Sequence, residues 1–255
     1  MSGTQYDSFS ENRPQNIYDD PSFFACYKDL RQNDTGINGA LEVPAVRRLL
    51  PDLYGKRVLD LGCGFGDLAR YARRSGAASV MALDVSARMI EEARRLTNDS
   101  NITYVRGAIE DYVPAPDSFD LVVSSMALHY VLDYRTVAQR AFDALRPCGR
   151  FVFSVEHPIC TANPVGWISD GLGSALYWPL DRYHEEGRRN TKWFVDGVIK
   201  YHRTVATYVN TLLATGFELE CLDEPVPTPE ASVGRPELQA HCRRPPILVL
   251  ACVHP

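Results

Sequence analysis

Short apolar segments alternate with helix-like segments between residues 57 and 155, and this alternation restricts the fold more than any other feature of the sequence. Five segments are short and apolar enough to be buried strands: 57–61, 79–83, 102–106, 119–125 and 150–155. Helices are predicted over 67–75, from an N-cap at Ser86 to residue 96, and near 137–145. Such alternation forms right-handed crossovers with helices on both faces of a sheet. With later strands at 217–222 and 247–253, the sequence predicts a Rossmann-like, doubly wound α/β fold with a mostly parallel seven-stranded sheet.

The chain divides into four regions around this pattern. Residues 1–50 hold a polar arm, expected to be flexible over 1–16, and a helical segment over 21–50 that is interrupted at 36–39 and at Pro44. Residues 51–157 form the alternating core. Residues 158–205 carry all three tryptophans and repeated glycines, which predicts an insertion. Residues 206–255 complete the sheet, after a helix predicted over 204–215.

Charge and hydropathy exclude several classes of partner. The net charge is -5 at pH 7, from 27 basic and 32 acidic residues, and argues against nucleic acid as a partner. The longest apolar segments, such as 247–253, are far shorter than the roughly 20 residues of a membrane span. The N-terminus lacks the layout of a signal peptide. We therefore expect a soluble, cytoplasmic protein that is a monomer or a homodimer.

The seven cysteines form no C-x-x-C pair, so neither a disulfide framework nor a structural zinc site is expected. The histidines and carboxylates likewise show no metal-ligand spacing at helical periodicity. No metal is predicted.

A glycine-rich loop, GCGFG over residues 62–66, follows the first predicted strand and begins the first helix. Open α/β sheets bind ligands at this place, where glycine lets a ligand approach the backbone and the helix N-terminus offers amide donors. Asp84 ends the second strand, 18 residues after Gly66, where its carboxylate can accept hydrogen bonds from two ribose hydroxyls. The G-x-G-x-G spacing differs from the G-x-G-x-x-G of dinucleotide enzymes, whose third glycine supports a pyrophosphate. The pattern thus favours a ligand without phosphates over NAD(P).

Five motifs in this order resemble those of the class I S-adenosylmethionine-dependent methyltransferases. They are VLDLGCGFG, ALDVS, VRGAIED, FDLVVSSMALHY and LRPCGRFVF. Within that superfamily the chain looks most like the small-molecule branch, which includes ubiquinone, menaquinone and sterol methyltransferases and many natural-product enzymes. The resemblance implies S-adenosyl-L-methionine as cofactor and S-adenosyl-L-homocysteine as product. It also implies methyl transfer to an O, N or C atom of a small aromatic or lipophilic acceptor.

The resemblance implies cofactor contacts residue by residue. Gly62, Cys63 and Gly64 would pass the methionine end, and Asp84 would hold the ribose. Further contacts are implied for the adenine (Val85, Met89, Ile109, Glu110), for the ammonium (the carbonyl of Ser124) and for the carboxylate (Tyr27, Arg31). Ala108 departs from the family pattern, in which an aspartate is common, so adenine recognition must use backbone groups or Glu110 and Asp111.

Methyl transfer from a sulfonium is an in-line displacement, so alignment of the reactants carries much of the rate. A base is needed only if the acceptor must lose a proton. His129 and His157 follow the fourth and fifth strands at the edge where ligands bind. A histidine pKa near 6.5 suits proton transfer near neutrality, so both are candidate general bases or acceptor contacts. A hydrogen-bonded structural role is the alternative for each.

The aromatic insertion over residues 158–205 is expected to form a lid over the acceptor site. Aromatic rings offer flat apolar surface to a planar acceptor and cation–π contact to a sulfonium. Candidate acceptor contacts are Trp167, Trp178, Tyr183 and Tyr201. The core of a lid or a dimer interface is the alternative role of these rings.

Other functions are compatible with parts of the pattern. Methylation of tRNA or protein is one, although the acidic net charge and the lack of a basic stripe weigh against RNA. An NAD(P)-dependent oxidoreductase is disfavoured by the glycine spacing. A non-catalytic S-adenosylmethionine-binding scaffold subunit would keep the same glycines and Asp84, and a blocked acceptor pocket would favour it.

Overall fold

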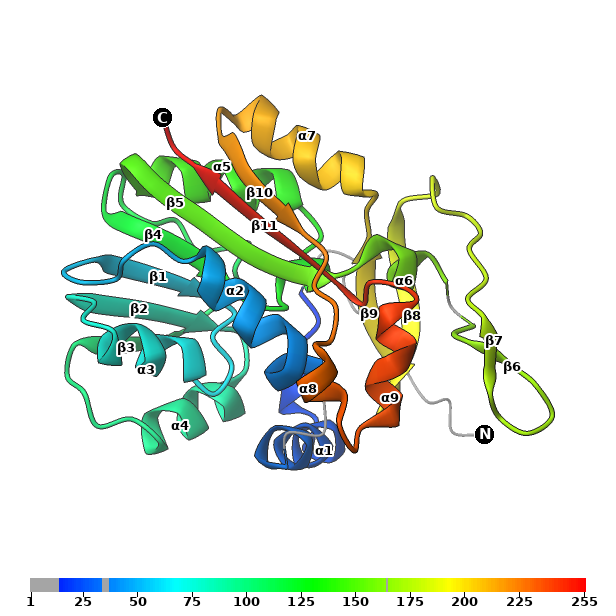
Figure 1. Cartoon of the computed structure of the whole chain (residues 1–255). Helices are drawn as coiled ribbons and strands as arrows, with labels where there is room; N and C mark the ends of the chain where they lie inside the picture. Colours follow the sequence, from blue (N-terminus) through cyan, green and yellow to red (C-terminus); the bar gives the residue numbers. More distant parts are fainter. Residues whose placement is uncertain (1–13, 34–36, 164) are drawn as a thin grey trace, which may run out of the picture.

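The computed structural model of the chain describes residues 14–33, 37–163 and 165–255. Figure 1 shows these residues arranged around one twisted sheet of seven strands, in the order β10-β11-β5-β4-β1-β2-β3. Strand bounds are β1 Arg57–Leu61, β2 Ser79–Asp84, β3 Ile102–Arg106, β4 Phe119–Ser124, β5 Leu145–Glu156, β10 Glu218–Asp223 and β11 Ile247–Val253. Most of the arm expected to be flexible, residues 1–13, lies outside the described residues.

Five neighbouring strands of the sheet are parallel. β1 pairs with β2 and β4, β2 with β3, and β4 with β5, all in parallel register. β11 then runs antiparallel between β5 and β10. The prediction of a mostly parallel, seven-stranded, doubly wound sheet is confirmed.

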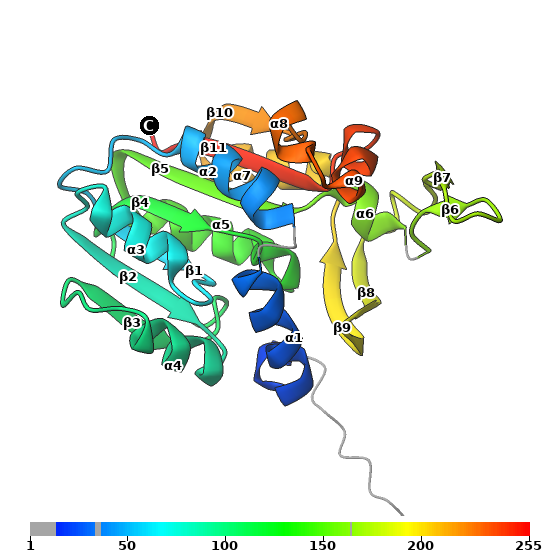
Figure 2. The same ribbon diagram turned by 60° about the horizontal axis from the view of Figure 1, so that its bottom comes forward.

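Helices cover both faces of this sheet, as Figures 1 and 2 show. Helices α2, α3 and α4 pack on one face, and α5 and α7 on the other. At the carboxyl edge of the strands lie α1, the short helix η1 and the π-helix η2. Helix bounds are η1 Ile17–Asp19, α1 Pro21–Gln32, η2 Asn38–Glu42, α2 Val43–Leu49, α3 Asp67–Arg74, α4 Ala87–Arg95, η3 Leu128–Tyr130, α5 Tyr134–Ala144 and α7 Val205–Thr215.

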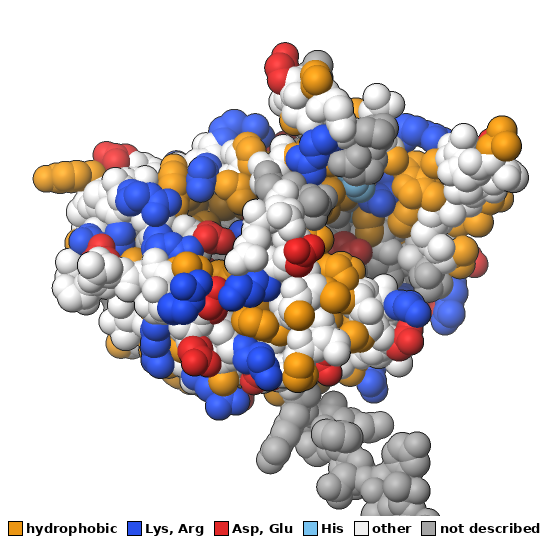
Figure 3. All heavy atoms as spheres, turned by 90° about the horizontal axis from the view of Figure 1, so that it is seen from below, with side chains coloured by type: hydrophobic (Ala, Val, Ile, Leu, Met, Phe, Trp, Pro, Cys, Tyr) orange, Lys and Arg blue, Asp and Glu red, His pale blue; other side chains and the backbone are white. Residues whose placement is uncertain are grey.

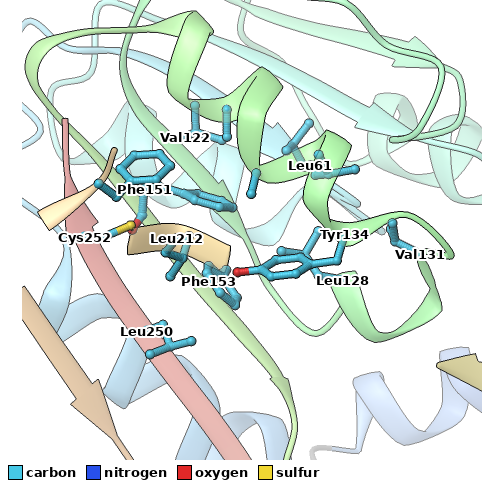
Figure 4. Close-up of a cluster of buried hydrophobic side chains, with 14 of the residues drawn as sticks. Leu61, Val122, Leu128, Val131, Tyr134, Phe151, Phe153, Leu212, Leu250 and Cys252 are labelled. Atoms are coloured by element: carbon cyan, nitrogen blue, oxygen red, sulfur yellow. The ribbon is translucent and has the colours of Figure 1, made fainter. Parts of the chain in front are cut away.

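Aromatic side chains of β5 join the sheet to α5 and α7 (Figure 4). The ring centroids of Phe151 and Phe153 lie 4.8 Å apart. Tyr134 of α5 lies 5.9 Å from Phe153 and 5.0 Å from Tyr208 of α7. All four rings are buried. Burial of large rings contributes strongly to stability, so this packing fixes the strand whose carboxyl end reaches the site described below.

Differences from the predicted elements have local causes. The predicted N-cap Ser86 does begin α4, and its Oγ accepts a hydrogen bond from the Met89 N–H at 3.1 Å. Helix α5 begins earlier than predicted, because Asp133 caps it through the Thr136 N–H. The helical segment does not stop at Pro44, but its type changes next to this residue: the π-helix η2 ends at Glu42 and α2 begins at Val43. Pro44 lies in the first turn of α2.

The insertion contains one short helix, α6 (Pro158–Ala162), and two hairpins. Their strands are β6 Ile168–Ser169 with β7 Ala175–Tyr177, and β8 Gly187–Trp193 with β9 Val195–His202. The β8–β9 hairpin stands beside α1, whereas β6–β7 projects away from the sheet (Figure 2). Between β10 and β11, where no element was predicted, lie α8 Pro229–Ser232, α9 Pro236–Gln239 and η4 Ala240–Cys242. Throughout the described ranges, no helix is long and apolar enough to cross a membrane.

Leu212 and Leu213 are neighbours on α7 that differ in burial, with 0% and 50% of their surface exposed. Leu212→Ala should lower the free energy of unfolding by about 2–5 kcal/mol, because it leaves a cavity in the core. Leu213→Ala makes the same change in helix propensity and should alter the free energy of unfolding by no more than about 0.5 kcal/mol. Urea unfolding measures both values. Equal losses would contradict this orientation of α7.

Candidate functional site

A cavity of about 1060 Å³ opens at the carboxyl edge of the parallel strands. Its walls come from the loops after β1, β2, β3 and β4, from η1 and α1, from the β8–β9 hairpin, and from the residues before β11. Figure 3 shows this hollowed face, with hydrophobic and basic side chains around the recess. Open α/β sheets bind their ligands at this edge, so the cavity is the candidate active site.

The glycine loop after β1 is attached to the end of β2. The N–H groups of Gly62 and Cys63 both donate to the Leu83 carbonyl, at 2.8 and 2.9 Å. The Gly64 N–H donates to Asp84 Oδ2 at 2.9 Å. Gly64 has a φ of +52°, and the space that a Cβ would take is open. The loop therefore presents bare backbone to a ligand in the cavity.

Two buried carboxyl groups line the cavity near the ends of β1 and β2. Asp84 accepts hydrogen bonds from the N–H groups of Gly64 and Ser86, and burial raises its pKa to about 6. Neither carboxyl oxygen of Asp60 has a hydrogen-bond partner in the described part of the chain, and burial raises its pKa to about 8. Burial of an unpaired carboxyl is unfavourable, so Asp60 suits a ligand that brings positive charge.

Most residues that the family resemblance implied for the cofactor line this cavity: Tyr27, Arg31, Gly62, Cys63, Gly64, Asp84, Val85, Met89, Ile109 and Glu110. Ser124 is not among the lining residues. Its side chain is fully buried, and its hydroxyl donates to the Leu61 carbonyl at 2.7 Å. The next residue, Ser125, lines the cavity and donates its hydroxyl to Glu42 at 2.6 Å. Ala108, the departure from the family pattern, also lines the cavity.

The segment over residues 14–32 bridges two sides of the cavity. On one side Asp19 binds the N-terminus of α4, where its carboxylate accepts the Ser86 hydroxyl at 2.6 Å. On the other side Gln15 binds β9, where its side-chain oxygen accepts the Ile199 N–H at 2.8 Å. The segment is therefore fastened both to the core and to the insertion.

The same segment lines the cavity with Tyr18, Tyr27 and Arg31. The hydroxyl of Tyr18 lies 3.4 Å from that of Tyr130. Burial raises the pKa of Tyr27 to about 12, so its hydroxyl keeps its proton near neutrality and can donate a hydrogen bond. Arg31 Nη2 lies 2.7 Å from Asp67 Oδ2.

His129 belongs to η3, lines the cavity and is 2% exposed. Its Nδ1 accepts a hydrogen bond from the Glu156 N–H at 3.2 Å. Burial, together with the nearby cations Lys200 and Arg203, lowers the pKa of His129 well below 6.5. The ring is therefore neutral at pH 7 and carries its proton on Nε2, because a backbone N–H can only donate. In this state His129 offers a hydrogen-bond donor rather than a general base.

His157 is buried and is not among the lining residues. Its Nδ1 accepts the Ile159 N–H at 3.1 Å and so caps α6. Its Nε2 lies 2.8 Å from Glu224 Oε1. Both ring nitrogens are engaged within the protein, which fits the structural alternative for His157 and does not fit the expected general base.

The aromatic residues predicted for the acceptor separate into two groups. Trp178 lines the cavity, whereas Trp167, Tyr183 and Tyr201 do not. The Trp178 indole N–H donates to the Ile159 carbonyl at 3.1 Å, and its ring packs edge-on against Trp167 with centroids 5.4 Å apart. The Tyr183 hydroxyl accepts a backbone N–H at the start of α7, which is a structural contact.

Sequence reasoning missed several lining residues: Glu42, Asp60, Tyr130, Glu156, Trp193, Lys200 and Arg244. Glu156 directly follows a predicted strand, and that position could have identified it. Lys200 comes from the insertion and reaches Glu156 at 2.6 Å. Among the residues that the structure describes, no three His, Cys, Asp or Glu side chains are grouped as a metal site requires.

Comparisons with known proteins indicate a methyltransferase. A family profile described as a methyltransferase domain matches residues 58–149. A solved S-adenosylmethionine-dependent methyltransferase from Mesorhizobium loti is 44% identical with a TM-score of 0.79, over 86% of this chain and 100% of that chain. A protein of uncharacterised function from Haemophilus influenzae is 34% identical over 247 residues, which are 94% of this chain and 97% of that protein. A ubiquinone biosynthesis O-methyltransferase from Neisseria meningitidis is 38% identical over 107 residues, 40% of this chain and 45% of that enzyme.

The similarity to the Mesorhizobium loti enzyme extends well beyond residues 58–149, and it includes the whole of that chain. It agrees with a cavity at the carboxyl edge of a parallel sheet and with a glycine loop without a pyrophosphate cradle. The chain therefore belongs to the class I S-adenosylmethionine-dependent methyltransferases, and S-adenosylmethionine is its cofactor.

Proposed function

We propose that this enzyme methylates an oxygen, nitrogen or carbon atom of a small molecule. The observation that carries the proposal is the volume of the cavity, about 1060 Å³. Pockets for one small ligand span roughly 300–1,000 Å³, so an acceptor has room beside the cofactor. The cavity runs from the glycine loop to the β8–β9 hairpin. Two ligands can therefore lie at its opposite ends. The name of the Neisseria meningitidis relative, an O-methyltransferase of ubiquinone biosynthesis, also supports a small acceptor.

We assign the cofactor to the part of the cavity nearest β1 and β2. Asp84 has lone pairs for ribose hydroxyls, and Gly64 leaves space for a close approach. S-adenosylmethionine also carries two cationic groups, an ammonium and a sulfonium, and the unpartnered Asp60 carboxyl fits a cation. Apolar lining residues suited to the adenine are Val85, Met89 and Ile109.

Methyl transfer depends on the alignment of the reactants more than on proton transfer. When bound, S-adenosylmethionine supplies a methyl group on a positively charged sulfur, which is a good leaving group. The residues of this chain then have to orient the acceptor and exclude water. His129 can orient the acceptor with its Nε2–H, because its Nδ1 is held by the Glu156 N–H.

Turnover is tested by measuring S-adenosylhomocysteine formed with a panel of phenols, quinones, amines and carboxylic acids. Small-molecule methylation requires turnover with at least one of them that depends on S-adenosylmethionine. Turnover confined to tRNA or protein acceptors would contradict the proposal.

Asp84→Ala should weaken the binding of S-adenosylhomocysteine by about 1.5–3 kcal/mol, because charge-assisted hydrogen bonds to the ribose are lost. Isothermal titration measures this change, with NADH as a ligand that should not bind. Glu91→Ala removes an exposed carboxylate of α4 and is the matched control. Unchanged affinity in Asp84→Ala would remove this residue from the cofactor site.

Asp60 should make cofactor binding depend on pH. Its pKa of about 8 means that the free enzyme holds this carboxyl protonated at pH 7. A bound cation favours the carboxylate, so binding releases a proton and affinity rises with pH, by up to about tenfold per unit below pH 8. Titration of S-adenosylmethionine between pH 6.5 and 7.5 should show this rise. Asp60→Asn should remove it, and an equal rise in that variant would assign it to another group.

The two histidines should respond differently to substitution. His157→Ala should lower the free energy of unfolding by about 0.5–2 kcal/mol through the lost helix cap, with S-adenosylhomocysteine affinity unchanged. His129→Ala should lower turnover with the identified acceptor. Loss of cofactor affinity in a folded His157→Ala protein would return this residue to the site.

A further inference from the structure

The two sides of the cavity differ in charge. The lining residues from the first 110 positions of the chain include five carboxyl groups and two arginines: Glu42, Asp60, Asp67, Asp84, Glu110, Arg31 and Arg47. From residue 156 onward it contains four basic and two acidic side chains: Glu156, Arg189, Lys192, Asp196, Lys200 and Arg244. The acidic side fits a cationic cofactor. The basic side belongs to the insertion and to the segment before β11, where the acceptor is expected.

Most of these basic groups already have partners within the protein. Lys200 pairs with Glu156 at 2.6 Å, and Lys192 with Asp196 at 3.4 Å. The guanidinium of Arg189 donates to backbone carbonyls of the same hairpin region. These groups are therefore at least partly compensated without a ligand.

Arg244 differs, because it has neither an ion pair nor a backbone carbonyl acceptor within the described ranges. It is half-buried, its Nη1 donates to Cys160 Sγ at 2.8 Å, and its Nε is buried without a hydrogen-bond partner. Burial raises the pKa of the Cys160 thiol to about 12, so this sulfur is neutral and supplies no negative charge. The positive charge of Arg244 is thus left at the cavity wall with a weak acceptor as its hydrogen-bond partner.

The position of Arg244 is fixed by aromatic packing. Its guanidinium lies 3.9 Å from the centroid of the Trp178 ring, and Trp178 is itself held through its indole N–H. The guanidinium therefore covers one face of the Trp178 ring, and both residues line the cavity. Guanidinium groups bind oxyanions in bidentate geometry, and a nearby ring suits the apolar part of the same molecule.

We propose that the methyl acceptor is an anion, whose carboxylate or phosphate ester binds Arg244 while its apolar part lies against Trp178. This rests on the proposed function, because it names the class of the small acceptor. Acidic groups on the cofactor side disfavour an anion there, so charge favours binding of the acceptor at the opposite end of the cavity.

The neighbouring Arg243 provides a matched control. Its guanidinium lies 4.7 Å from the Trp167 ring centroid, and it donates to the Ala175 and Leu176 carbonyls. It does not line the cavity. Arg243→Gln and Arg244→Gln remove one positive charge each from adjacent positions, so a difference between them reports contact with the ligand rather than net charge.

The experiment titrates protein saturated with S-adenosylhomocysteine with benzoate, phenyl phosphate and the neutral benzamide. At least one anion should bind at least about tenfold more tightly than benzamide, and the stronger anion distinguishes a carboxylate from a phosphate ester. In Arg244→Gln the affinity for the anion relative to benzamide should fall close to one, whereas Arg243→Gln should keep the ratio of the wild-type protein. Benzamide binding as tightly as both anions, an unchanged ratio in Arg244→Gln, or no anion binding tighter than about 10 mM would each overturn the proposal.

Affinity for S-adenosylhomocysteine shows whether each variant keeps a folded site. If Arg244→Gln no longer binds S-adenosylhomocysteine, Arg244→Lys replaces it in the test. The lysine variant keeps the charge but not the planar donor pair, so it should lose part of the preference for anions. A full preference in that variant would overturn the bidentate contact between the anion and Arg244. Failure of the wild-type protein to bind the cofactor or to methylate any small molecule would instead contradict the proposed function.

Discussion

The backbone hydrogen bonds between the loop after β1 and the end of β2 are the connection on which the rest of the site depends. Gly62 and Cys63 share the Leu83 carbonyl, and Gly64 holds one oxygen of Asp84. Because β1 and β2 are parallel neighbours, their carboxyl ends meet at the same level, and the loop of one can reach the end of the other. The carboxylate is therefore oriented before a ligand arrives, which reduces the ordering that binding requires.

The core of the fold was predictable because its strands are buried on both faces. Such strands appear as short apolar runs, and β1 and β11 have the bounds that the sequence predicts. The edge strand β3 also has its predicted bounds, although part of it is exposed. The residues that follow these strands are placed by the topology, so most of the cofactor residues implied by the family motifs do line the cavity. Asp60 was missed for a related reason, since a carboxyl inside an apolar strand gives no local sign of which way it points.

The acceptor side was less predictable, because composition does not determine orientation. In the β8–β9 hairpin, successive side chains point to opposite faces, and the sequence does not say which face meets the cavity. Tyr201 of β9 was therefore grouped with Trp178, although its side chain does not line the cavity. Tyr183 lies in a turn before the hairpin, where no periodic pattern predicts the orientation of a side chain. His157 was misjudged for another reason. His157 lies between the end of β5 and the start of α6. A histidine in this position can cap the helix as well as contact a substrate. Arg244 comes from a segment of short helices with no periodic pattern to predict its place.

The bridge over residues 14–32 has a consequence for the coupling between the two ligands. It is bound to α4 through Asp19 and to β9 through Gln15, and it lines the cavity with Tyr18 and Tyr27. A ligand that shifts the β8–β9 hairpin therefore also pulls on the residues beside the cofactor, and the reverse holds equally. Whatever free energy couples the two ligands through this bridge must be reciprocal, so an acceptor that tightens the hold on the cofactor is held more tightly by the same factor.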